Sequence, residues 1–148
     1  NPIFSDKKRL RLIALAVVLA AQCALLIGQP ATGFAQGEAQ LKARYFPRAN
    51  NASRMVGGSF EGSHDGQAWT TLGVITSAPA AGQFSEKTLG TTPYRFLRYV
   101  APQGSYGNVA EIEFYDGAPK LAGTNIGSAG SFENNGNTID KALDGNTN

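Results

Sequence analysis

Few side chains in this chain could carry out catalysis. Glu111 and Glu113 lie two residues apart in an extended stretch, which puts them on one face, about 6.6–7 Å apart. That separation suits the paired carboxylates of a glycoside hydrolase, but two neighbours on one exposed strand face form no cleft for a substrate. The chain has one histidine, His64, and one cysteine, too few for a base-activated nucleophile or a Cys/His zinc cluster. The sequence therefore predicts a protein that is not itself an enzyme.

The stretch from Tyr94 to Tyr115 is the clearest structural signal. Its composition predicts two β-strands, over 94–100 and 108–115, joined by a loop that contains proline and glycine. In the second strand Ile112 and Phe114 fall on one face, and Glu111 and Glu113 fall on the other. The first of these faces is expected to pack in a core.

The stretch upstream reads as further short strands separated by turns. Trp69 is expected in the core, and a bulge is expected near Gly73. The additional strands are predicted over 41–46, 55–60, 69–76 and 84–89. Short strands at this spacing predict an all-β chain that forms an antiparallel β-sandwich.

Charge is concentrated at the start of the chain. Lys7, Lys8, Arg9 and Arg11 lie within the first eleven residues, and the chain beyond residue 35 keeps nine basic and ten acidic side chains. Nucleic-acid binding needs clustered lysine and arginine, so this near-neutral remainder argues against it.

Residues 1–35 resemble a signal peptide, with an expected signal helix. A basic stretch precedes the apolar run 12–27, and Gly33-Phe34-Ala35 supplies small residues for cleavage after Ala35. The run is shorter than the roughly 20 residues of a membrane-spanning helix, so contact with a membrane is expected only if the segment stays uncleaved. The protein is therefore expected to be secreted or displayed at the cell surface.

The order of motifs between Leu41 and Tyr115 resembles the discoidin family, also called F5/8 type C or galactose-binding-like, which includes the family 32 carbohydrate-binding modules. The matching features are Ser63 with Asp65-Gly66 ahead of Trp69, the YRFLRY strand from Tyr94, and the closing stretch from Asn108 to Phe114. The resemblance implies a jelly-roll sandwich at 36–117, whose N-terminal part is missing.

The end of the chain resembles the opening of such a module, with an A-x-D-G-N loop at 142–146. That opening normally precedes the rest of the module, and here it follows. Two explanations stay open. In a tandem array, residues 118–148 are a glycine- and asparagine-rich linker and the start of a second module. In a permuted module, the tail pairs with the strands of its own chain.

The resemblance also implies two kinds of site. A structural calcium ion would be bound by side-chain and backbone oxygens. In a permuted module these ligands would form one site, and in a tandem array they would be divided between two modules. These ligands would come from Ala110, Glu111, Lys141, Asp144 and Asn146. A sugar would be bound by end loops, where rings stack on C–H groups and polar side chains bind hydroxyls. The loop candidates are Arg48, Asn50, His64, Asp65, Tyr106 and Asn108.

Three functions remain open. The first is a non-catalytic module that binds carbohydrate, such as a cell-surface glycan or polysaccharide. The second is a structural or cell-adhesion repeat that contacts protein or neighbouring modules. The third is an accessory module of a secreted glycoside hydrolase whose catalytic domain lies elsewhere in the parent protein.

Overall fold

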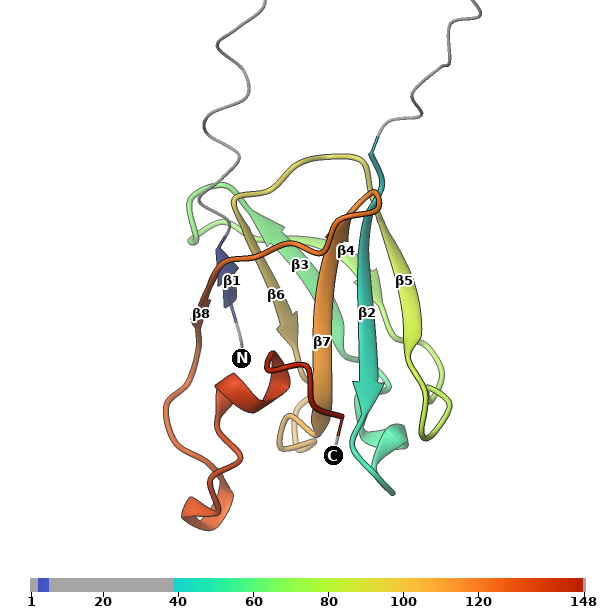
Figure 1. Ribbon diagram of the computed structural model, residues 1–148, viewed down its shortest axis with the longest axis vertical. Helices are drawn as coiled ribbons and strands as arrows, with labels where there is room; N and C mark the ends of the chain where they lie inside the picture. Colours follow the sequence, from blue (N-terminus) through green and yellow to red (C-terminus); the bar gives the residue numbers. More distant parts are fainter. Residues whose placement is uncertain (1–2, 6–38, 148) are drawn as a thin grey trace, which may run out of the picture.

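The computed structural model describes residues 3–5 and 39–147, which form a β-rich body with three short 3-10 helices (Figure 1). The strands are β1 Ile3–Ser5, β2 Leu41–Pro47, β3 Ser59–Ser63, β4 Thr70–Val74, β5 Ser85–Gly90, β6 Phe96–Val100, β7 Val109–Asp116 and β8 Thr124–Ile126. The 3-10 helices are η2 Ala52–Met55, η3 Phe132–Asn134 and η4 Ile139–Ala142. The all-β prediction is confirmed.

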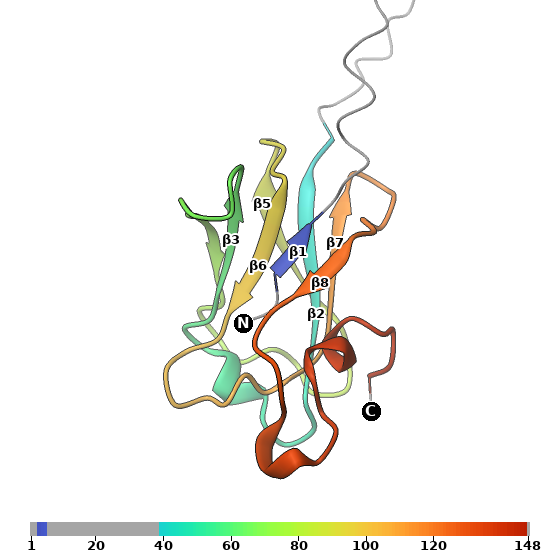
Figure 2. The same cartoon turned by 90° about the vertical axis from the view of Figure 1, so that its left-hand side faces the viewer.

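Two antiparallel sheets make up the body. One has five strands in the order β4-β3-β6-β1-β8, and the other has three in the order β5-β2-β7. Figure 1 shows the smaller sheet in front of β3, β4 and β6, and Figure 2 shows the same layers from the side. Residues of β2 alternate between buried and half-buried because successive side chains point to opposite faces. The predicted sandwich is confirmed.

The core lies between the two sheets and centres on Phe60 of β3, which is fully buried. Its ring lies 5.4 Å from that of Tyr45, 5.5 Å from that of Tyr99 and 6.1 Å from that of Phe114, measured between ring centres. Tyr45 and Phe114 come from the smaller sheet, while Phe60 and Tyr99 come from the larger one. Aromatic packing of this kind therefore joins the two layers.

Two local predictions differ from the structure. Met55 is buried but lies in η2, so the strand predicted over 55–60 begins only at Ser59. Trp69 is only half-buried, and the guanidinium of Arg98 lies 3.9 Å from the centre of its ring, so Trp69 is outside the core. The bulge expected near Gly73 is present, because the pairing of β3 with β4 shifts register beside it.

The tail after residue 117 belongs to the same body. Its strand β8 pairs with β1 in the larger sheet, and η4 packs on β7. Ala142 is buried, while Leu121 and Leu143 pack against the core. These contacts tie the tail to the body, while the choice between a tandem array and a permuted module stays a prediction.

The expected signal segment lies mostly outside the described residues, including its apolar run. Of that segment the structure describes only Ile3–Ser5, which form β1 between β6 and β8. Within the described ranges, no helix is long and apolar enough to cross a bilayer.

Candidate functional site

A pocket of about 320 Å³ opens at the end of the sandwich where β6 ends and β7 begins. The loop between these strands forms one wall, and the tail between β8 and η4 forms another. Its polar lining includes Arg48, Tyr106, Asn108, Asn135, Asn137 and Lys141. Three of these carry planar amides, which can donate and accept hydrogen bonds together, as sugar hydroxyls require.

The β6–β7 loop is held by hydrogen bonds around Ser105, which is buried. Its hydroxyl donates to the carbonyl of Pro102 over 2.7 Å, and its own carbonyl accepts from the side-chain amide of Asn108 over 2.6 Å. These bonds fix the turn that presents Tyr106 and hold the Asn108 side chain against its own loop, where it lines the pocket.

Tyr106 is the most exposed large hydrophobic side chain among the described residues, with 77% of its surface accessible. Its backbone φ is 58°, in the left-handed region that bulky residues seldom adopt. Such strain persists only where the surrounding structure imposes it, and it concentrates at functional sites. The guanidinium of Arg54 lies 5.6 Å from the centre of the Tyr106 ring.

The six predicted loop residues divide between the two ends of the sandwich. Arg48, Tyr106 and Asn108 line the pocket, and Asn50 lies in the exposed turn after β2, at the same end but outside the lining. His64 follows β3 at the opposite end, because Ser63 pairs with Phe96 and Ser59 pairs with Val100.

At that opposite end, His64 and Asp65 both have structural partners. The ring of His64 stacks on that of Tyr94, with centres 4.9 Å apart. Asp65 accepts hydrogen bonds from the backbone N–H groups of Gln67 and Ala68 and from the Ser63 hydroxyl, and these bonds lower the pKa of its carboxyl. Asp65 therefore caps its own turn.

The residues predicted to bind calcium meet beside β7. Glu111 is fully buried, and its Oε2 accepts the backbone N–H of Gly145 over 3.0 Å. Its other oxygen, Oε1, is buried and has no hydrogen-bond partner among the residues that the structure describes. Burial raises the pKa of this carboxyl. An unpartnered buried carboxylate oxygen is costly and is the kind of donor that a hard cation satisfies.

Asp144 lies next to Gly145 and is engaged differently. Its Oδ1 accepts the N–H of Asn146 over 2.9 Å, its Oδ2 accepts from the ammonium of Lys141 over 3.3 Å, and the Asn146 bond lowers the pKa of this carboxyl. Within residues 3–5 and 39–147, no three His, Cys, Asp or Glu side chains form a metal-binding group. A cation here would therefore need backbone carbonyls beside Glu111 and Asp144, such as those predicted at Ala110, Lys141 and Asn146.

The bulge at Ala110 explains how Glu111 is set in place. Phe46 pairs with Glu111 and Pro47 pairs with Val109, so Ala110 is the extra residue. Glu113, two residues on, is half-buried and pairs with Arg44 at 3.2 Å and with Lys120 at 2.8 Å.

Sequence reasoning missed Asn135 and Asn137 as pocket residues. It also missed Arg54, which is not part of the lining but lies beside the Tyr106 ring. Arg54 lies in η2, where no pattern in the sequence predicts a ligand contact. The two asparagines lie in the polar stretch that composition marked as a linker. The many asparagines in this stretch were the feature of the sequence that could have indicated a ligand-binding surface.

No protein-family model and no curated protein matches this chain. Among solved structures, the chain is similar to CBM62 from Clostridium thermocellum Xyl5A, with 30% sequence identity and a TM-score of 0.49. The match covers 58% of this chain and 65% of that one, less than two thirds of its length.

Proposed function

We propose that this chain is a non-catalytic carbohydrate-binding module of the discoidin or galactose-binding-like kind, and that it binds a sugar in the pocket beside Tyr106. The observation that carries the proposal is a strained, exposed tyrosine next to three amide side chains. A tyrosine ring stacks on the C–H face of a sugar, and amides bind its hydroxyls. The pocket volume of about 320 Å³ lies within the range of small-molecule sites.

The test compares the two ends of the sandwich. Binding of the full chain to soluble polysaccharides is measured by affinity electrophoresis and calorimetry for Tyr106→Ala, Asn108→Ala and His64→Ala. Loss of the ring should weaken binding about tenfold, equivalent to about 1.4 kcal/mol. Tyr106→Phe should keep most of the affinity because it keeps the ring.

His64→Ala is the matched control, since His64 is also an exposed loop residue but lies at the other end. It should leave binding unchanged. Loss of binding in His64→Ala with retention in Tyr106→Ala would move the site to the opposite end. Failure of the wild-type chain to bind any polysaccharide would refute the proposal and favour an adhesion repeat that contacts protein.

We further propose that the chain is exported and that it binds a structural calcium ion. Export rests on the basic, apolar and small-residue pattern of residues 1–35. Cleavage after Ala35 would remove β1 from the larger sheet and leave the packing of η4 on β7 to hold the tail. Calcium rests on the unpartnered Oε1 of Glu111, with Asp144 close by in the chain segment that contacts it. When bound, the ion would neutralise this buried carboxylate and tie the tail to β7.

A further inference from the structure

The pocket is lined by cations and by no carboxylate. Arg48 and Lys141 both line it, and none of the Asp or Glu residues that the structure describes does. The guanidinium of Arg54 adds a third positive charge at the same end, 5.6 Å from the centre of the Tyr106 ring. Nearby positive charges with no opposing carboxylate in the wall make the pocket attractive to an anion.

Arg48 is the cation best placed to act on a ligand. It is exposed and has no ion-pair partner among the residues that the structure describes. The arginines of the sheets are used differently: Arg44 pairs with Glu86 and Glu113, and Arg98 pairs with Glu61. Lys141 pairs with Asp144 at 3.3 Å, but the Lys141 side chain keeps 62% of its surface exposed, so the solvent weakens this pair.

We propose that the pocket selects an acidic sugar, and that Arg48, helped by Lys141, binds the carboxylate or sulfate group of that sugar. This inference rests on the proposed function, because it names the class of sugar that the same pocket takes. A guanidinium presents two parallel N–H groups that match two oxygens of a carboxylate or sulfate. A neutral sugar offers Arg48 only hydroxyls, so the charge contributes less to its binding.

The experiment measures binding of the full chain to neutral galactan, polygalacturonate and sulfated galactan at 50 mM and 300 mM NaCl. Arg48→Gln removes the charge and keeps hydrogen-bonding groups. It should weaken binding to the acidic polymers about tenfold and to neutral galactan less than twofold. Arg48→Lys keeps the charge but loses the two parallel N–H groups, so its affinity for the acidic polymers should lie between those of the wild-type chain and Arg48→Gln.

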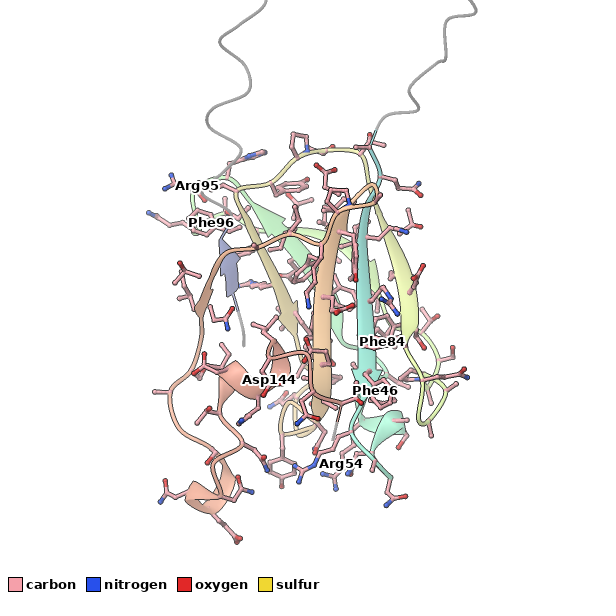
Figure 3. The ribbon with its side chains drawn as sticks, viewed as in Figure 1. Phe46, Arg54, Phe84, Arg95, Phe96 and Asp144 are labelled. Atoms are coloured by element: carbon pink, nitrogen blue, oxygen red, sulfur yellow. The ribbon has the colours of Figure 1, made fainter. Side chains whose placement is uncertain are left out.

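Arg95→Gln is the matched control for net charge. Arg95 is exposed and lies at the opposite end of the sandwich from Arg54, as Figure 3 shows. This variant should bind all three polymers as the wild-type chain does. Both positions are exposed, so thermal unfolding of the variants should match that of the wild-type chain.

The outcomes separate this inference from the function on which it rests. Equal wild-type affinity for neutral and acidic polymers, or equal losses in Arg48→Gln and Arg95→Gln, would overturn the acidic-sugar inference and leave carbohydrate binding intact. Absence of binding to all three polymers would overturn the proposed function itself. A selective loss confined to polygalacturonate assigns the ligand a carboxylate, and one confined to sulfated galactan assigns it a sulfate; either supports the inference.

Discussion

Glu111→Gln should change stability in opposite directions with and without calcium. The wild-type carboxylate is fully buried; within the described part of the chain, one oxygen accepts a backbone N–H and the other has no hydrogen-bond partner. In EDTA its charge is uncompensated, and burying an unpaired charge costs several kcal/mol. In the variant the side-chain amide still accepts the N–H of Gly145, but this neutral hydrogen bond stabilises the folded chain by about 1–2 kcal/mol less than the charged one. We therefore expect the variant in EDTA to be more stable than the wild-type chain by about 1 kcal/mol.

In calcium the order should reverse. An ion that binds only the folded chain stabilises it by about 2.7 kcal/mol at a concentration one hundred times its Kd. The variant lacks the charged ligand and should gain much less, so the wild-type chain becomes the more stable by about 1–2 kcal/mol. Urea unfolding, followed by tryptophan fluorescence in EDTA and in millimolar CaCl₂, measures all four states.

Glu113→Gln is the matched control for this experiment. Glu113 lies on the same strand, but its carboxylate pairs with Arg44 and Lys120 and accepts the Tyr115 hydroxyl. Its loss should destabilise the chain by about 1 kcal/mol, equally in EDTA and in calcium. If calcium leaves the wild-type midpoint unchanged, or if Glu111→Gln is destabilising to the same extent in both buffers, the reasoning about Glu111 is wrong.

Two further predictions concern the core and the tail. Burial, with a smaller contribution from Tyr45, raises the pKa of Tyr99 to about 12 from 10.0, so the folded chain keeps this proton when the unfolded chain has lost it. Stability should therefore fall between about pH 10 and pH 12 by roughly 3 kcal/mol in total, and Tyr99→Phe should unfold in urea with a shallower loss over that window. Truncation after residue 117 removes β8 and η4 and should abolish cooperative unfolding; an unchanged urea midpoint would show that the tail is an independent unit.

The strands could largely be read from the sequence, because alternation and turn residues are local signals. The burial of Glu111 could not. Alternation puts Glu111 on the same face as Glu113, yet the tail covers it from 34 residues away, through Gly145. No local pattern reports such a contact. Only part of the pocket was predicted, for the same reason. Arg48, Tyr106 and Asn108 lie in loops of the stretch that resembles the discoidin family, while Asn135 and Asn137 come from the tail.

The division of the six loop candidates, by contrast, could have been deduced by counting strands. In a chain of antiparallel strands, successive connections fall at alternate ends of the sandwich. The connection after β2 carries Arg48 and Asn50, and the one after β6 carries Tyr106 and Asn108, so they share an end. The connection after β3 carries His64 and lies at the opposite end of the sandwich.

This separation constrains any ligand. Five residues of β6 span about 17 Å at 3.4 Å per residue. A single sugar bound beside Tyr106 therefore cannot also reach His64, and the two ends cannot form one site. The connection after β8 falls at the Tyr106 end by the same count, which brings Asn135 and Asn137 to the pocket. The tail thus contributes both to the fold, through Glu111, and to the end of the sandwich where arginine, tyrosine and amides gather around a pocket.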